Sequence, residues 1–234
     1  MAATHATDAT DATHAFIFDM DGTIVDNMAY HTRSWISFFE QRGMAIDGEA
    51  FFCATAGRQG KEIIRSHLGE HLTDAAVTAL NGEKEGVYRA LYGPHRKTVA
   101  GFDALIARAQ AAGIKLAVAT AAPVANIEFT LDGLDLRRHF DAVVGAADVA
   151  RGKPHPDGFL LAAERLGVAA GHCIVFEDAP LGVEAARNAG MRCVVLTTTL
   201  PAAAFAAYDN VIAIASDFAA LDMDALFSLT LKKP

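Results

Sequence analysis

Two aspartates end the first apolar run of the chain, with one residue between them. Asp19 and Asp21 stand in the stretch FIFDMDGT. An ionised carboxylate can attack phosphorus and form an acyl phosphate, which divides one difficult displacement into two easier ones. In an extended segment, a spacing of two residues points both side chains the same way. Asp19 is therefore predicted to be a nucleophile, and Asp21 an acid that protonates the leaving oxygen and then acts as a base.

Two carboxylates that face an anionic phosphate need compensating positive charge. Mg²⁺ is suited to this task, because it is a hard cation that accepts carboxylate and phosphate oxygens while it retains water. A second acidic pair, Glu177 and Asp178, ends another apolar run of the sequence. We expect Asp178, with Glu177 beside it, to complete a magnesium site with the first pair.

Further residues are suited to binding the phosphate itself. Lys153, in the stretch RGKPHPD, would neutralise its charge. The hydroxyl of Thr120 and the backbone amides of Gly22 and Ala121 would hold its oxygens. Every charge of the proposed site then has a partner.

Short apolar runs of strand length are expected to position these residues. They are nearly continuous in hydrophobicity, as strands covered on both faces are. The five runs are residues 14–18, 115–120, 141–145, 172–176 and 192–196. Helical patterns between them end at Gly113, Gly167 and Gly190, where a left-handed C-cap is accepted at little cost. Strand alternating with helix predicts an α/β fold with a doubly wound, Rossmann-like parallel sheet, whose ligands bind beyond the carboxyl ends of the strands.

Residues 26–95 interrupt this alternation. They contain amphipathic, helix-like stretches with no convincing strand between them: MAYHTRSWISFFEQRG, GKEIIRSHLG and TDAAVTALNGEKEGVYRALYG. We therefore expect an all-helical cap at 26–95, inserted into a core formed by 14–25 and 96–234. Residues 1–13 repeat a THA/TDA triplet, and they are predicted to be a disordered tail because they cannot bury enough apolar surface to order themselves.

Composition limits the classes of partner. The 234 residues are 52% hydrophobic and carry a net charge of −8, so no basic face is expected for a nucleic acid or an anionic membrane surface. No segment has about 18 uninterrupted apolar residues, and the first 13 residues do not resemble a signal peptide. The three cysteines lack CxxC spacing, which argues against a disulfide framework and favours a reducing cytoplasm. We expect a soluble monomer or small homo-oligomer with a small phosphorylated substrate.

The motifs, taken in order, resemble those of the haloacid dehalogenase superfamily of phosphotransferases. They are DMDGT at 19–23, the strand-ending Thr120, Lys153 in GKPHPD, and the acidic pair in FEDAPLGVEAARNAG. The resemblance covers residues 14 to about 200. It implies that Asp19 is the nucleophile, that Asp21 is the acid/base, and that magnesium is held by Asp19, the Asp21 carbonyl and Asp178, with Glu177 nearby. It also implies that the helical block is a mobile cap.

Within that superfamily, DNMAYHTRSW resembles the beta-phosphoglucomutase-like branch, which carries a Tyr-His-x-x-x-Trp stretch. That likeness places His31 near the acid/base. The stretch TAGRQGKEII resembles a loop that these enzymes lower onto the substrate, so Arg58 and Lys61 are candidates for substrate contact. The polar run that a mutase has after its second motif is replaced here by Thr120-Ala121-Ala122-Pro123. A magnesium-dependent phosphatase acting through an aspartyl phosphate on a small metabolite, such as a sugar phosphate, is therefore favoured over a phosphosugar mutase.

Other interpretations stay open at this stage. A receiver domain also uses a doubly wound sheet and a phosphorylatable aspartate, but its acidic pair comes first, and it has neither an equivalent of Asp21 nor a cap. His31 alone could be a hydrogen-bonded packing residue. Trp35 is more simply explained as core of the cap, and Arg58 and Lys61 as a solvated helix start.

Overall fold

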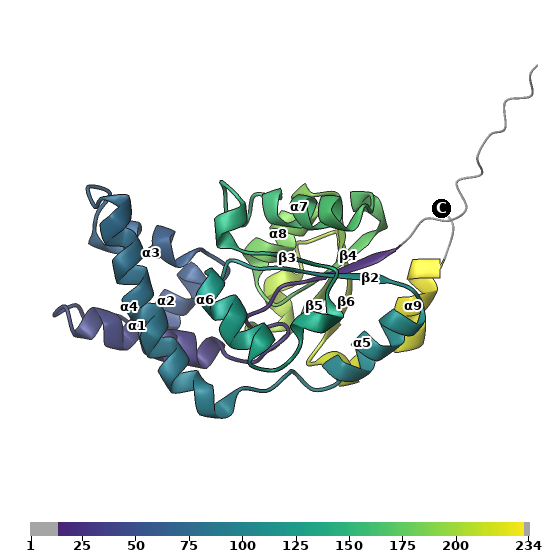
Figure 1. Cartoon of the computed structure of the whole chain (residues 1–234), viewed down its shortest axis with the longest axis horizontal. Coiled ribbons are helices and arrows are strands. Elements are labelled where there is room, and N and C mark those ends of the chain that lie inside the picture. The colour runs from purple at the N-terminus through teal and green to yellow at the C-terminus, as the bar shows by residue number, and fades with distance from the viewer. Residues whose placement is uncertain (1–13, 232–234) are drawn as a thin grey trace, which may run out of the picture.

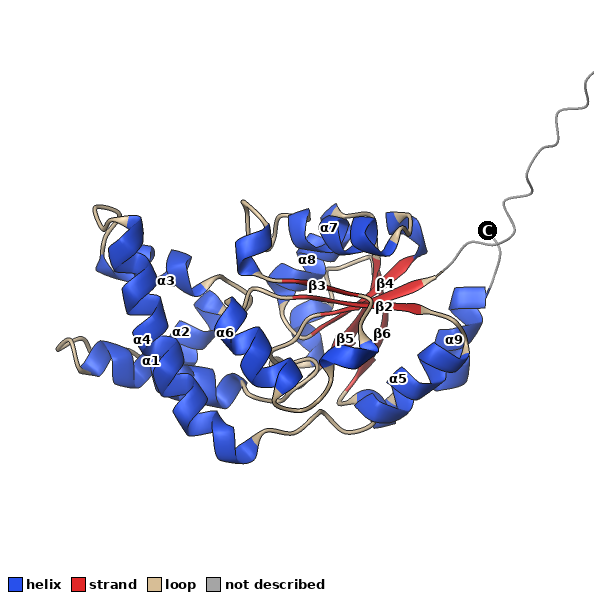
Figure 2. Cartoon of the chain, in the orientation of Figure 1, coloured by secondary structure: helices blue, strands red, loops and turns tan. Residues whose placement is uncertain are grey.

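The computed structural model describes residues 14–231, and the tail predicted at 1–13 lies outside this range. Its centre is a sheet of six parallel strands (Figures 1 and 2). The strands are β1 (Ala15–Phe18), β2 (Lys115–Ala119), β3 (Ala142–Val144), β4 (Cys173–Glu177), β5 (Arg192–Leu196) and β6 (Val211–Ala215). Their order is β3-β2-β1-β4-β5-β6, with each neighbouring pair parallel. The α/β fold with a parallel sheet is thus confirmed, with β6 as a strand that the sequence pattern did not predict.

Helices cover both faces of the sheet, which explains why its strands are continuously apolar. Phe16 and Phe18 of β1 belong to the core on the side of α5 (Phe102–Ala111) and α9 (Met223–Leu231). Ala15 and Ile17 belong to the core on the opposite side. That side is covered by α7 (Asp157–Leu166) and α8 (Pro180–Asn188), as Figure 1 shows. All four residues of β1 are fully buried.

Glycine ends three of these helices, as the sequence predicts. Gly113, Gly167 and Gly190 follow α5, α7 and α8 and have φ angles of +70°, +69° and +71°. This left-handed conformation carries no side-chain penalty at glycine. Each helix therefore stops before the next strand of the alternating pattern.

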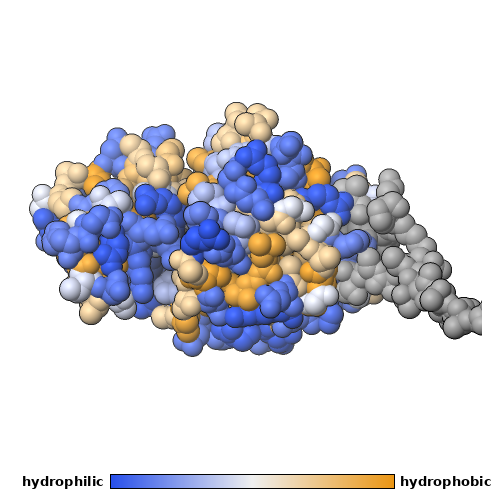
Figure 3. Space-filling view, turned by 90° about the horizontal axis from the view of Figure 1, so that it is seen from above, coloured by the Kyte–Doolittle hydropathy of each residue, from blue (hydrophilic) through white to orange (hydrophobic). Residues whose placement is uncertain are grey.

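A helical cap is inserted between β1 and β2. Its helices are α1 (Met28–Glu40), α2 (Gly48–Thr55), α3 (Gly60–Leu68) and α4 (Asp74–Tyr92). Trp35, Phe38, Phe39 and Phe51 form part of a small core of its own. Figure 3 shows a largely hydrophilic outer surface on this part of the molecule. Helix α2 was not predicted, and the cap boundaries at 26 and 95 stay a prediction.

The two chain segments that join cap and core lie side by side. Val25 and Thr98 form an antiparallel bridge, and the Val99 amide donates to the Ile24 carbonyl at 2.9 Å. After β2, the short helix α6 (Val124–Ile127) runs into a π-helical turn. Six short 3₁₀ turns complete the described chain: Gly93–His95, Arg137–His139, Ala146–Asp148, Ala170–His172, Ala202–Phe205 and Phe218–Ala220. No helix within residues 14–231 has the length and apolar character that crossing a membrane requires.

Candidate active site

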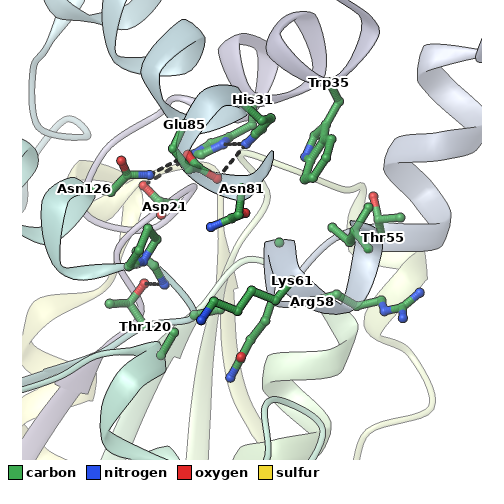
Figure 4. A pocket seen from close by; sticks show the side chains of 18 of the residues that line it. Asp21, His31, Trp35, Thr55, Arg58, Lys61, Asn81, Glu85, Thr120 and Asn126 are labelled. Atoms are coloured by element: carbon green, nitrogen blue, oxygen red, sulfur yellow. Dashed lines mark hydrogen bonds and ion pairs between the residues drawn. The ribbon is translucent and has the colours of Figure 1, made fainter. Parts of the chain in front are cut away.

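The carboxyl ends of three adjacent strands carry the predicted site. Asp19 follows the central strand β1, Thr120 follows β2, and Glu177 ends β4, directly before Asp178. Because β1 pairs with both β2 and β4, these ends meet at one edge of the sheet. A cavity of about 470 Å³ opens there between core and cap (Figure 4). Asp19, Asp21 and Thr120 line it from the core side.

Lys153 lies between two carboxylates. Its Nζ donates to Oδ1 of Asp19 and, at 2.5 Å, to Oε1 of Glu177. Burial alone would lower the pKa of Lys153, but these two carboxylates raise it, so the lysine is charged. Burial raises the pKa of Asp19 to about 7, with Lys153 opposing this effect and Glu177 adding to it. Negative charge therefore remains in excess around Asp19.

Asp178 is held by hydroxyl groups from two loops. It accepts hydrogen bonds from Oγ1 of Thr23 at 3.1 Å and from Oγ1 of Thr199. Burial, with Glu177 and Asp19 nearby, raises its pKa well above the usual range. Its carboxylate packs directly on Gly22, where a Cβ atom would lie 2.0 Å from Oδ2. Only a glycine leaves room for the carboxylate in this position.

These acids fit a magnesium ion in charge and in donor type. Asp19 and Asp178 are buried carboxylates on neighbouring strand ends. Their pKa values are raised by burial and then by neighbouring carboxylates, and a divalent cation would offset both effects. Within residues 14–231, no three side chains of His, Cys, Asp or Glu lie close enough to hold a metal by themselves. A magnesium ion here would therefore also need backbone, water or phosphate oxygens, as Mg²⁺ commonly does.

Glu177 has other partners in this structure. Its Oε1 accepts from Lys153, and its Oε2 accepts from the amides of Asp178 and Ala179 at 2.9 and 3.0 Å. Both oxygens are thus engaged in fixing Lys153 and the turn before α8. Its predicted role as a metal ligand stays a prediction, and the geometry supports a role in placing the lysine. The N-cap residue of α8 is Ala179, which makes no side-chain cap hydrogen bond.

Asp21 is held beside the cap by polar neighbours. Its Oδ1 accepts from Nδ2 of Asn27 at 2.6 Å and lies 3.8 Å from Nε2 of His31. Burial would raise the pKa of Asp21, but His31, Asn27 and Lys84 together lower it. The ionised carboxylate is therefore the form that these neighbours stabilise.

A buried lysine fixes the orientation of His31. Nζ of Lys84 donates to Nδ1 of His31 at 2.9 Å and to Oε1 of Glu85, also at 2.9 Å. Because an ammonium group has donors only, Nδ1 of His31 must accept, and its remaining ring nitrogen faces Asp21. The His31 ring stacks on Tyr88 with 3.7 Å between centroids. This set of contacts ties the acid/base candidate to helices α1 and α4 of the cap.

The same network reaches back to the core. Oε2 of Glu85 accepts from Nδ2 of Asn126 at 2.6 Å, and Oδ1 of Asn126 accepts from Arg89 at 2.7 Å. Asn126 belongs to α6, directly after the strand end that carries Thr120. Cap and core are thus joined by hydrogen bonds on one side of the cavity, as the dashed lines in Figure 4 show.

The structure brings most of the sequence-predicted residues to one cavity. Its lining includes Asp19, Asp21, Thr120, Ala121, His31, Arg58 and Lys61. Lys153 and Glu177 lie behind Asp19, and Gly22 lies against Asp178. Trp35, assigned to the cap core, also lines the cavity.

The residues that sequence reasoning missed are Asn27, Asn81, Lys84, Glu85, Tyr88, Asn126 and Thr199. The spacing along α4 indicates that four of them share one helix face, but not that this face is buried at the site. Asn81, Lys84, Glu85 and Tyr88 are spaced three, one and three residues apart, and they share one helix face with Val77.

The chain is similar to known proteins in sequence and in fold. A family model described as haloacid dehalogenase-like hydrolase matches residues 13–190. The validoxylamine A 7'-phosphate phosphatase of Streptomyces hygroscopicus subsp. limoneus is 36% identical over 194 residues, which are 82% of this chain and 90% of that protein. The fructose-1-phosphate phosphatase YqaB of Escherichia coli K12 is 36% identical over 178 residues, 76% of this chain and 93% of the relative. A crystal structure of beta-phosphoglucomutase from Clostridium difficile has a TM-score of 0.81 at 24% identity, covering 92% of this chain and 96% of that one.

Proposed function

Because the chain belongs to the haloacid dehalogenase-like hydrolases, as its ordered motifs predict, we propose that it is a magnesium-dependent phosphatase of a small phosphorylated sugar or polyol. The observation that carries this proposal is the placement of Asp19, bonded to Lys153, beside Asp21 in one cavity under the cap. Two relatives at 36% identity are named as phosphatases of validoxylamine A 7'-phosphate and of fructose 1-phosphate, which supports the substrate class.

In the first step, a carboxylate oxygen of Asp19 attacks phosphorus, and the bond from phosphorus to the ester oxygen breaks. An aspartyl phosphate forms and the alcohol departs. Lys153 would hold one phosphoryl oxygen, while Thr120 and the amides of Gly22 and Ala121 hold the others. Bound magnesium would neutralise phosphoryl charge and fix the oxygens in position for attack.

Asp21 carries out the proton transfers of both steps. The protonated form of Asp21, which is the minor form beside His31, Asn27 and Lys84, gives its proton to the departing ester oxygen. The carboxylate left behind then takes a proton from a water molecule that attacks the aspartyl phosphate. Hydrolysis releases inorganic phosphate and restores Asp19. The contacts of Asn27 and His31 with Asp21 hold its carboxylate near the cavity, so that one group serves both steps.

The cap limits which phosphate esters can react. A cavity of about 470 Å³ accommodates a small leaving group, whereas a phosphoprotein would not fit under the closed cap. Arg58 and Lys61 line the cavity on the loop between α2 and α3 and at the start of α3. In Figure 4 the Lys61 side chain extends toward Thr120, which supports a contact with the bound substrate.

A phosphosugar mutase of the beta-phosphoglucomutase type is the second candidate. The contact of His31 with both Asp21 and Lys84 favours it, since it gives the acid/base firm support in the cap. Against it, the three residues that follow Thr120, Ala121 to Pro123, line the cavity and offer no polar side chain to a second phosphate. The receiver-domain interpretation is set aside, because the chain belongs to a hydrolase family.

A product assay distinguishes the candidates. The protein is incubated with Mg²⁺ and a panel of phosphate monoesters that includes fructose 1-phosphate, hexitol phosphates and pyrophosphate. Beta-glucose 1-phosphate primed with the 1,6-bisphosphate is run beside them. Multiple turnover with release of inorganic phosphate, abolished in Asp19→Asn, supports the phosphatase. Glucose 6-phosphate formed without phosphate release would overturn it in favour of the mutase.

A further inference from the structure

One face of helix α4 points its polar residues toward the cavity. Lys84 is bonded to His31, Glu85 to Asn126, and Tyr88 to Asn27. Asn81 lies one turn before Lys84 on the same face and also lines the cavity. Unlike these three neighbours, it makes no side-chain hydrogen bond to any part of the chain that the structure describes. Its Oδ1 is buried without a donor.

The position of Asn81 is costly for the fold alone. The residue is only 7% exposed, and asparagine in a helix interior is a weaker helix former than leucine or alanine. Buried amide groups normally have hydrogen-bond partners, because an unpaired polar group loses its contact with water. In Figure 4 the side chain points into the cavity between His31 and Lys61. The Oδ1 atom packs against Gly60, so the amide nitrogen, which has no acceptor among residues 14–231, is the atom left for a ligand in the cavity.

The surroundings of Asn81 favour a neutral polar group over an anion. The charge of Lys84 is compensated by Glu85, and the Lys61 side chain extends toward Thr120, so no uncompensated cation of the described α4 residues lies within one turn of Asn81. The Trp35 ring also lines the cavity, and an aromatic face can pack on the apolar C–H side of a sugar or polyol. A hydroxyl group can accept a hydrogen bond from the amide nitrogen of Asn81. The part of the cavity that Asn81 and Trp35 line is thus suited to a ligand with hydroxyl groups on a carbon chain.

We propose that Asn81 is a specificity-determining residue that hydrogen-bonds a hydroxyl group of a polyhydroxylated leaving group. This inference rests on the proposed phosphatase function and deepens it. The departing alcohol would lie between the phosphoryl site at Asp19 and the α4 wall, with its hydroxyl group replacing water at Asn81. Substrates that lack this hydroxyl would leave the amide unpaired when the cap closes over them.

A purely structural role for Asn81 has to be separated from this one. Its Oδ1 lies against Gly60, where a Cβ atom would come within 2.1 Å of it. Asn81 could therefore matter for packing of α3 on α4 alone. A packing role predicts equal effects on all substrates, whereas a hydroxyl contact predicts an effect that depends on the leaving group.

The test compares substrates with and without hydroxyl groups on the leaving alcohol. Asn81→Leu, which keeps the size and removes the hydrogen bonds, is assayed with the best sugar or polyol phosphate of the panel and with p-nitrophenyl phosphate. We expect the ratio of their kcat/KM values to fall by about 10-fold to 100-fold. Glu83→Gln on the outer face of α4 is the matched control, and thermal unfolding reports on folding. Asn81→Ser provides a milder variant if the leucine variant does not fold.

Monodeoxy analogues of the best substrate add a second readout. One analogue should lose a similar factor with the wild-type protein and lose nothing further with Asn81→Leu, because the same contact is already absent. Parallel losses on both substrate types, or no change in the ratio, would overturn the role of Asn81. Wild-type turnover of p-nitrophenyl phosphate but of no polyol phosphate would overturn it as well, while the phosphatase function stands. A wild-type protein that hydrolyses no phosphate ester would instead sink the proposed function, and this inference with it.

Discussion

Asn126 on the core side of the cavity donates a hydrogen bond of 2.6 Å to Glu85 on the cap side. Both side chains are buried, at 1% and 5% exposure. Arg89 of the cap donates to the same asparagine. The closed arrangement is thus stabilised by directed hydrogen bonds between cap and core, which are sensitive to single-atom changes.

Removing this link should weaken substrate binding more than chemistry. In Asn126→Ala, Oε2 of Glu85 loses its donor and Arg89 loses its acceptor, so this arrangement of cap and core becomes less populated. We expect KM to rise about 3-fold to 10-fold with a smaller change in kcat, because apparent affinity falls with the fraction of competent protein. Steady-state kinetics on the best substrate of the panel measure this.

Asn126→Asp should have a larger effect than the alanine variant, because it places a second carboxylate against Glu85. Arg137→Gln, which breaks the exposed pair with Asp132, is the control and should leave KM within about 2-fold of the wild type. An unchanged KM in both Asn126 variants would contradict a role of this link in closure.

Asp19→Asn should abolish turnover, by a factor on the order of 10⁴ or more, since it removes the nucleophile. The affinity for magnesium should fall, but binding should persist because Asp178 remains. Phosphate release and magnesium titration by calorimetry measure the two effects. A turnover that stayed within about 10-fold of the wild-type value would exclude Asp19 as the nucleophile.

The same variant should change the pH dependence of stability without metal. Burial raises the folded-state pKa of Asp19 from 3.8 to about 7, so the folded protein holds a proton there that the unfolded chain releases. Stability from this group is therefore complete below pH 4 and is lost as the pH rises to about 7. Urea unfolding in EDTA should show Asp19→Asn gaining stability over the wild type at pH 8, by on the order of 1 kcal/mol or more, and much less at pH 5. Equal differences at both values would contradict the raised pKa.

Asp21→Ala should slow poor leaving groups far more than good ones. A sugar alkoxide needs a proton as it departs, whereas p-nitrophenolate does not. We expect a loss of about 10²-fold to 10⁴-fold on the sugar phosphate and a much smaller loss on p-nitrophenyl phosphate during formation of the aspartyl phosphate. Rapid-quench measurement of that first step checks the difference. Equal losses on both substrates would remove Asp21 from the acid role.

His31→Gln should shift the alkaline limb of the pH profile of kcat. Burial would raise the pKa of Asp21, and His31 is the strongest of the neighbours that lower it. Without the imidazole the pKa of Asp21 should rise, so the acid keeps its proton to a higher pH and the limb moves to higher pH. His67→Gln, on the outer cap helix α3, serves as control. A limb that stays in place would show that His31 does not set the charge of Asp21.

The alternating core was predictable because its signals are local. Each inner strand is a short apolar run, and helices α5, α7 and α8 end at glycines with positive φ. Strand β6 was not predicted, because it lies partly exposed at the sheet edge and follows an alanine-rich stretch that favours helix. Helix α2 was not predicted, because its eight residues are too few to show a periodic pattern, although Asp47 caps its first amides.

The site was predictable where it depends on strand ends and less so where it depends on the cap. Asp19, Thr120 and Asp178 meet because neighbouring parallel strands end together. Lys84 and Glu85 stand in a charged helix that has the pattern of a solvated surface. They are buried only because α4 packs against both α1 and the α6 segment, a tertiary arrangement that no local pattern contains.

The bridge between Val25 and Thr98 limits how the cap can move. Two separate linkers would let the cap slide, twist or swing over the sheet. The segment that enters the cap and the segment that leaves it are hydrogen-bonded to each other. Rotation about the bridge between them is therefore the cap movement that would require the least free energy. A cap that turned about an axis fixed beside β1 would carry its residues along a single arc, and it would return His31 to the same place beside Asp21.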